Sequence, residues 1–217
     1  MNNIKERAAY FKTNRIEALS DGVFAIVMTL LVIELSVPLV SKLKASVELG
    51  GMLLEMWPKF FAFAISFLVL GIFWFTHHSQ FHFIKRSNGM FVWINILFLL
   101  SVAFIPFSTA LIGEYHIYSK LAVVFWGING FLCLLMLNII WWYASANKRL
   151  ISKKAEPQNI KSFQISLIMS AAVFLPAIGL VFINPIISIA IFVISALYGV
   201  ISNIFWGSAE KLQRLLK

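Results

Sequence analysis

Charged side chains are scarce in this chain. They make up 12 % of its 217 residues, whereas a soluble domain carries about 25 %. Hydrophobic residues make up 60 %, and the mean hydropathy is +0.87. A chain of this composition has too few polar side chains to cover its surface in water. The sequence therefore predicts a multi-pass membrane protein.

Other absences exclude whole classes of function. Cys133 is the only cysteine, so an intramolecular disulfide is excluded. The chain has no glycine-rich phosphate loop, no nucleophile elbow and no paired carboxylates inside its apolar segments. It also lacks an internal repeat, and its longest polar stretch is the connection near 145–162. We expect one membrane domain over residues 1–217 that is not an enzyme and holds no cofactor.

Six apolar segments are long enough to span a membrane, which takes about 20 residues for about 30 Å of hydrocarbon. The last two are divided by Asn184-Pro185, because proline removes a backbone donor and biases its predecessor away from helix. The predicted fold is an all-α integral membrane protein with six transmembrane helices. The expected spans are 15–37, 57–78, 89–112, 119–143, 163–183 and 186–206.

The positions of the cations predict the orientation of these spans. Most of the 18 Lys and Arg residues lie on one side, before the first span and after the second, fourth and sixth. By the positive-inside rule, the tails 1–14 and 207–217 are cytoplasmic. We expect the protein to lie in the cell (inner) membrane. The net charge of +9 is then mainly a signal of topology. We expect the lipid bilayer as a partner, and no nucleic acid.

The first span separates into two faces when it is drawn as a helix at about 100° per residue. Ile26, Thr29, Leu30 and Ile33 fall on one stripe, which is apolar except for the threonine hydroxyl. Asp21 falls nearly opposite Ile26. Asp21 therefore does not share the surroundings of the stripe.

Polar residues at the start of this span need partners, because an ionisable group at the membrane margin is costly when it is alone. We expect Ser20 and Asp21 to contact donors on neighbouring helices. Two simpler interpretations stay open. Arg15 is also suited to be an anchor that reaches the headgroups, with Asp21 still in the interface. An apolar stripe alone is more often a packing surface than the lining of a pore.

These residues resemble a known signature. Arg15-x-x-x-Leu19-Ser20-Asp21 is similar to the Arg-x-x-x-Phe-Ser-Asp motif in the first helix of the lysosomal transmembrane-protein-175 potassium channels and their bacterial relatives. This chain has Leu19 where the family usually has phenylalanine. Trp74-Phe75-Thr76-His77-His78 resembles the family's Trp-x-x-His-His pattern. Asn95 with Pro106-Phe107-Ser108-Thr109 resembles its third span.

The resemblance implies a homotetramer with a central pore for potassium ions, lined by the first helix of each subunit. No TVGYG run, the carbonyl filter of ordinary potassium channels, occurs in this chain. In the family, bulky apolar side chains of the first helix form the constriction instead. By spacing from the Ser-Asp pair, these positions fall on Ile26, Thr29 and Ile33, with Leu30 as the alternative to Thr29. We expect modest selectivity for potassium.

The resemblance also implies roles outside the constriction. Arg15, Ser20 and Asp21 would attach the pore helix to the bundle, through hydrogen bonds to His77 or Asn95. Glu34 would raise the local cation concentration at the outer mouth, or would pair between subunits.

Other interpretations are a secondary cation transporter and a non-conducting membrane scaffold. A proton-coupled carrier is disfavoured because charges cluster at the ends of the spans and not at the midplane. His77, His78 and His82 lack a nearby acidic or thiol ligand, so we expect no metal site there.

Overall fold

The structure is a computed structural model in which residues 12–38, 45–153 and 155–198 are described. Five helices are long and apolar enough to cross a membrane, and a sixth, shorter apolar helix spans Pro185–Tyr198. The prediction of a helical membrane protein is therefore confirmed. The elements are α2 (Asn14–Ile33), α3 (Ala45–Glu55), α4 (Trp57–Phe83), α5 (Gly89–Ala103), α6 (Ile105–Tyr115), α7 (Lys120–Ser145), the 3-10 turn η1 (Ala146–Lys148) and α8 (Pro157–Leu180).

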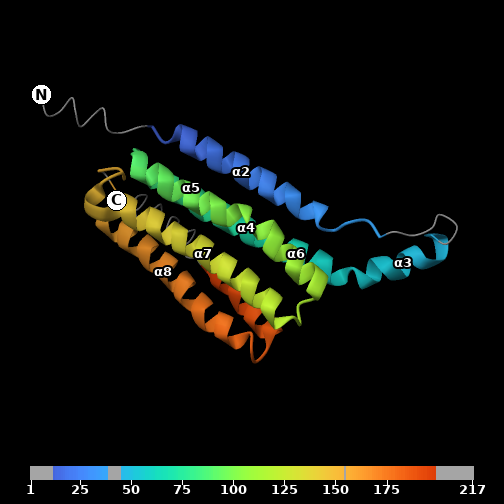
Figure 1. The fold of residues 1–217 in the computed structure, drawn as a ribbon. Coiled ribbons are helices and arrows are strands. Elements are labelled where there is room, and N and C mark those ends of the chain that lie inside the picture. The colour runs from blue at the N-terminus through green and yellow to red at the C-terminus, as the bar shows by residue number, and fades with distance from the viewer. Residues whose placement is uncertain (1–11, 39–44, 154, 199–217) are drawn as a thin grey trace, which may run out of the picture.

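The helices lie side by side in a bundle with α2 on one side and α8 on the other (Figure 1). α2 packs against α4, α5 and α6, whereas α8 packs against α7. The start of α2, the α4–α5 connection and the α7–α8 connection lie at the same end of the bundle (Figure 1). That end carries most of the cations of the described residues and is the end predicted to be cytoplasmic.

The helices differ from the expected spans at several ends. α4 continues to Phe83, five residues beyond the predicted end of the second span, so His77 lies more than one turn inside the helix and not near its end. α3 was not predicted, because an 11-residue helix is too short for the length criterion of a span. The tails 1–11 and 207–217 and the end of the sixth span lie outside the described residues.

Prolines and an asparagine set several helix boundaries. Pro58, Pro106 and Pro157 each lie in the first turn of their helix, where the missing N–H costs nothing. Pro106 also ends α5, because it cannot donate to the carbonyl four residues earlier, and the third span is divided at Phe104. The predicted turn at Asn184-Pro185 is confirmed. Asn184 Oδ1 accepts from the N–H groups of Ile186 and Ile187, at 3.0 and 3.2 Å, and so caps the following helix.

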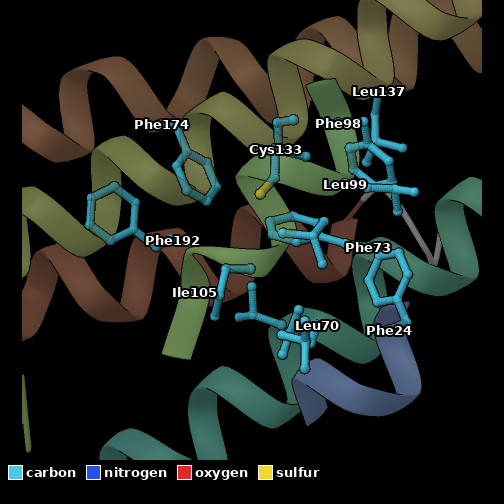
Figure 2. Packing of buried hydrophobic residues seen from close by; sticks show 14 of the residues in the cluster. Phe24, Leu70, Phe73, Phe98, Leu99, Ile105, Cys133, Leu137, Phe174 and Phe192 are labelled. Atoms are coloured by element: carbon cyan, nitrogen blue, oxygen red, sulfur yellow. The ribbon is translucent and has the colours of Figure 1, made fainter. Parts of the chain in front are cut away.

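The core of the bundle is built mainly from aromatic and branched side chains contributed by most of the helices (Figure 2). Phe24 of α2 lies against Phe98 of α5, with ring centroids 5.9 Å apart. Phe174 of α8 lies against Phe192 of the helix Pro185–Tyr198, with ring centroids 4.8 Å apart. Together these contacts fix the rotation of α2 at one side of the bundle and the position of α8 at the other.

Gly127 on α7 is required for the second of these contacts. A Cβ added there would lie 2.6 Å from Phe192 Cζ, and that ring is fully buried. We expect Gly127→Ala to lower the free energy of unfolding by about 1–3 kcal/mol, because the ring has no space to move into. Gly71→Ala on α4 is the matched control, since its Cβ meets nothing within 4 Å. Thermal unfolding in detergent measures both, and equal midpoints would contradict this packing.

Candidate functional site

α2 has one buried and one exposed face. Phe24, Val27 and Leu31 point into the bundle and are almost fully buried. On the opposite face, Ile26 and Ile33 are 60 % and 67 % exposed. From Leu19 to Ile33 this face is apolar except for the Thr29 hydroxyl, and it has no partner in the described part of the chain. It therefore faces either lipid or other copies of this helix.

Thr29 and Leu30 differ in their place on this face. The buried residues centre on a direction nearly opposite Thr29, whereas Leu30 lies toward the edge of the exposed face and is 41 % exposed. Thr29 Oγ1 donates its hydrogen to the carbonyl oxygens of Ala25 and Ile26, at 3.1 and 2.8 Å. Because the hydrogen is directed back to the helix, the oxygen lone pairs of Thr29 are available to an external donor or cation.

A buried chain of hydrogen bonds joins α2 to α5 and α4. Asn95 Nδ2 donates to Ser20 Oγ at 3.1 Å, and Ser20 Oγ donates to the Ile16 carbonyl at 2.9 Å. His77 Nε2 lies 2.8 Å from Asn95 Oδ1. Since that oxygen can only accept, the histidine proton is on Nε2. All three side chains are buried, so each bond lies in surroundings where a lost partner cannot be replaced by water.

The rings around His77 hold it in place. Its imidazole is stacked on Phe98 of α5, with ring centroids 5.2 Å apart and an interplanar angle of 10°. Phe81, one turn further along α4, lies with its ring centroid 4.5 Å away. Phe98 also contacts Phe24, so the same aromatic group supports both the histidine and the buried face of α2.

Asp21 makes a separate contact with α4. Trp74 Nε1 donates to Asp21 Oδ1 at 2.8 Å, and the Trp74 ring is stacked on His78 at a centroid distance of 5.4 Å. Asp21 is exposed, so this bond lies on the surface of the bundle beside the exposed face of α2. The expected partners of Asp21 were His77 or Asn95, and the structure gives Trp74 instead, the first residue of the pattern that contains His77.

Arg15 does not take part in the hydrogen bonds that join α2 to α4 and α5. Its side chain is exposed and forms no hydrogen bond or ion pair in the part of the chain that the structure describes. The anchoring role of Arg15 therefore stays a prediction, and the contacts that join α2 to its neighbours come from Ser20 and Asp21.

Glu34 lies at the other end of α2, beside a cavity of about 230 Å³. The cavity is lined by apolar side chains of α2, α4 and α6 and by an ion pair in which Lys59 Nζ lies 2.7 Å from Glu114 Oε2. Lys59 neutralises Glu114, so the carboxylate of Glu34 is the uncompensated charge of the cavity lining. The role of Glu34 at an outer mouth stays a prediction. The ion pair could not be predicted from the sequence, because 55 residues separate its partners.

The histidines have other partners than a metal. His77 is bound to Asn95, His78 is stacked on Trp74, and His82 lies edge-on to Phe83. Among the described residues, no three His, Cys, Asp or Glu side chains are grouped closely enough to hold a metal ion.

The sequence of this chain matches a known protein family and two of its bacterial relatives. The family model of the endosomal/lysosomal potassium channel TMEM175 matches residues 15–106, which include α4, α5 and all of α2 except its first residue. A potassium channel of Chamaesiphon minutus is 37 % identical over 191 residues, covering 86 % of this chain and 93 % of that protein. A potassium channel of Streptomyces collinus is 30 % identical over 190 residues, covering 86 % and 91 %.

The structure agrees with the sequence comparison. The crystal structure of a lysosomal potassium-selective channel TMEM175 homolog from Chamaesiphon minutus aligns with a TM-score of 0.76 at 32 % identity. The alignment covers 88 % of this chain and 98 % of that one, so the likeness extends over the whole bundle. With its helical membrane fold, its two-faced α2 and these matches, the chain belongs to the TMEM175 family, which is a family of ion channels and not of enzymes.

Proposed function

We propose that this protein is a modestly selective potassium channel of the cell (inner) membrane, in which four copies surround a central pore lined by α2. The observation that carries the proposal is the exposed, mainly apolar face of α2, which includes Ile26 and Ile33 and has no partner in the described residues. Its relatives of matching length are named potassium channels, which supports potassium as the permeant ion.

The polar contacts of α2 support a pore over a lipid-facing role for this face. A helix that only contacts lipid needs no fixed rotation, yet Ser20 and Asp21 bind α5 and α4 from different sides of α2. These contacts fix the direction in which the exposed face points. A gate needs such a fixed direction, because a small rotation changes which side chains meet at the axis.

Conduction then depends on hydration. Isoleucine side chains from several subunits, facing each other, make a passage in which water is unfavourable, so the closed state excludes ions by dewetting. A slight rotation or separation of the helices admits partly hydrated ions. Sodium holds its water more strongly than potassium and pays a larger cost, so the passage favours potassium modestly.

Thr29 and Leu30 are distinguished by a matched pair of variants. We expect Thr29→Val, which keeps the shape and removes the oxygen, to lower the potassium-to-sodium permeability ratio by roughly threefold or more, about 0.7 kcal/mol. Leu30→Ala should leave the ratio unchanged, because Leu30 lies toward the edge of the exposed face. Reversal potentials in bilayers measure both. A changed ratio for Leu30→Ala with an unchanged ratio for Thr29→Val would assign the constriction to Leu30 instead.

Potassium flux into liposomes tests the proposal as a whole. Purified protein should carry potassium down its gradient with little saturation and without a coupling ion. Uptake that requires a second ion gradient would identify a carrier. The absence of flux from correctly folded protein would identify a non-conducting scaffold.

A further inference from the structure

Two connections at the predicted cytoplasmic end of the bundle are joined through their backbones. The N–H groups of Lys85 and Arg86 both donate to the Leu150 carbonyl, at 2.9 and 3.2 Å. The Ser152 N–H donates to the Phe83 carbonyl at 2.9 Å, beside an isolated antiparallel bridge between residues 84 and 151. The α4–α5 and α7–α8 connections, more than 60 residues apart in the sequence, therefore form a single platform.

This platform carries mainly cations. Lys85, Arg149 and Lys153 are exposed and form no ion pair within the described part of the chain. Arg86 lies beside them and donates from its guanidinium to the Arg149 carbonyl at 3.1 Å. Glu156 is the only acidic residue of the described connections 84–88 and 146–156. Because like charges on a rigid platform repel, an anion that binds there is favoured.

Another lysine closes the platform and is not available to a ligand. Lys148 Nζ donates to the Ala155 carbonyl at 2.9 Å, across the loop that follows α7. Lys148 and Asn147 both have a φ of 51°, which turns the chain sharply after α7. The turn places Arg149 beside the α4–α5 connection, so the backbone fixes the positions from which the exposed cationic side chains extend.

Aromatic residues mark the depth of the platform in the membrane. Trp142, on the last turns of α7, is 65 % exposed, and tryptophan is enriched at the level of lipid headgroups. The Arg149 guanidinium lies 4.5 Å from the centre of the Tyr143 ring. That ring is tied to the α4–α5 connection, because Asn88 Nδ2 donates to the Tyr143 hydroxyl at 3.1 Å. The cations therefore lie at the level of phosphate groups in the membrane.

We propose that the cationic platform formed by Lys85, Arg86, Arg149 and Lys153 binds the phosphate of an anionic lipid headgroup. Arginine suits this ligand because its planar fork offers two parallel N–H donors to phosphate oxygens, and the lysines add charge. A lipid is favoured over a soluble phosphate by the position of Trp142. The platform lies at the end of α4, α5, α7 and α8, apart from the exposed face of α2, so this binding does not depend on the proposed pore.

Native mass spectrometry of the purified protein in detergent tests the proposal. Phosphatidylglycerol is titrated onto the wild-type protein and onto the variant K85Q/R149Q/K153Q, with phosphatidylcholine as the zwitterionic comparison. Glutamine at these positions leaves every backbone bond of the platform in place. We expect phosphatidylglycerol to bind the variant at least about tenfold more weakly, since each cation near an anionic surface contributes to binding. Phosphatidylcholine should bind both proteins equally.

Two controls separate this site from the general positive charge of the protein. The variant K85R/R149K/K153R keeps the charges and should stay within about twofold of wild type. Lys12→Gln removes an exposed cation before α2 and should change nothing. Where the triple glutamine variant does not fold, Lys153→Gln alone is measured, with a smaller loss expected.

Three results would overturn the proposal. The first is equal phosphatidylglycerol binding by wild type and the triple variant. The second is equal loss on Lys12→Gln, which would mean that the total charge and not the platform attracts the lipid. The third is displacement of the bound lipid by an excess of inorganic phosphate, which would identify a soluble anion as the ligand.

Discussion

Replacing Ile26 or Ile33 with asparagine is expected to raise potassium flux by about tenfold or more, which corresponds to a barrier lowered by about 1.4 kcal/mol. An amide in place of a branched apolar side chain keeps water in the constriction, so the dewetted state is lost. The discrimination between potassium and sodium should fall at the same time, because ions then keep more of their hydration. Currents in planar bilayers and flux into liposomes measure the two effects.

Folding should not be affected by these substitutions. Both side chains are mostly exposed in the single chain, so neither contributes to the core. Ile168→Asn is a matched control, since Ile168 is 51 % exposed and belongs to α8, which lies on the other side of the bundle from α2 (Figure 1). It should leave currents and ion preference unchanged. Wild-type currents and selectivity for both Ile26→Asn and Ile33→Asn would show that the exposed face does not line a pore.

The second large effect is expected at Asn95. Asn95→Leu removes its bonds to Ser20 and His77. The buried His77 then loses its hydrogen-bond partner, and Ser20 keeps only its bond to the Ile16 carbonyl. We expect the free energy of unfolding to fall by about 1–3 kcal/mol. The rotation of α2 should no longer be fixed, so the fraction of protein that elutes as an oligomer should fall as well. Thermal unfolding and size-exclusion chromatography measure these two quantities.

Asn138→Leu is the matched control for this variant. Asn138 Nδ2 donates to the Leu134 and Leu167 carbonyls, at 2.9 and 3.1 Å, where α7 meets α8. Its loss should also lower the unfolding midpoint but should leave the oligomer fraction and the currents unchanged. Asp21→Ala should reduce assembly less than Asn95→Leu, because the bond to Trp74 is exposed. Normal assembly and current in Asn95→Leu would contradict the anchoring role of the network.

The sequence could predict the spans because length and hydropathy are local properties. The turn at Asn184 could be predicted for the same reason, since its cap and the following proline are adjacent in the chain. The two faces of α2 also follow from helical periodicity alone. Periodicity does not say what each face contacts. The burial of Phe24, Val27 and Leu31 shows which face of α2 packs against the other helices.

The pairing of side chains across helices could not be predicted in the same way. Trp74 and Asp21 are 53 residues apart, and neither residue type specifies the other. The joined α4–α5 and α7–α8 connections are held by backbone groups, which leave no mark in the sequence. The role of Arg15 is not decided by its place in the motif. Its side chain is exposed and forms no hydrogen bond or ion pair among the described residues, so an anchoring role stays a prediction.

Single-channel recording of the purified protein in a planar bilayer tests the central claim most directly, with potassium on one side and sodium on the other. The account predicts discrete unitary currents. Their reversal potential should be shifted from zero in the direction that indicates a modest preference for potassium over sodium. The same recordings should lose this preference in Ile26→Asn. Unitary currents that reverse at zero, or no unitary currents from protein that is folded and assembled, would contradict it.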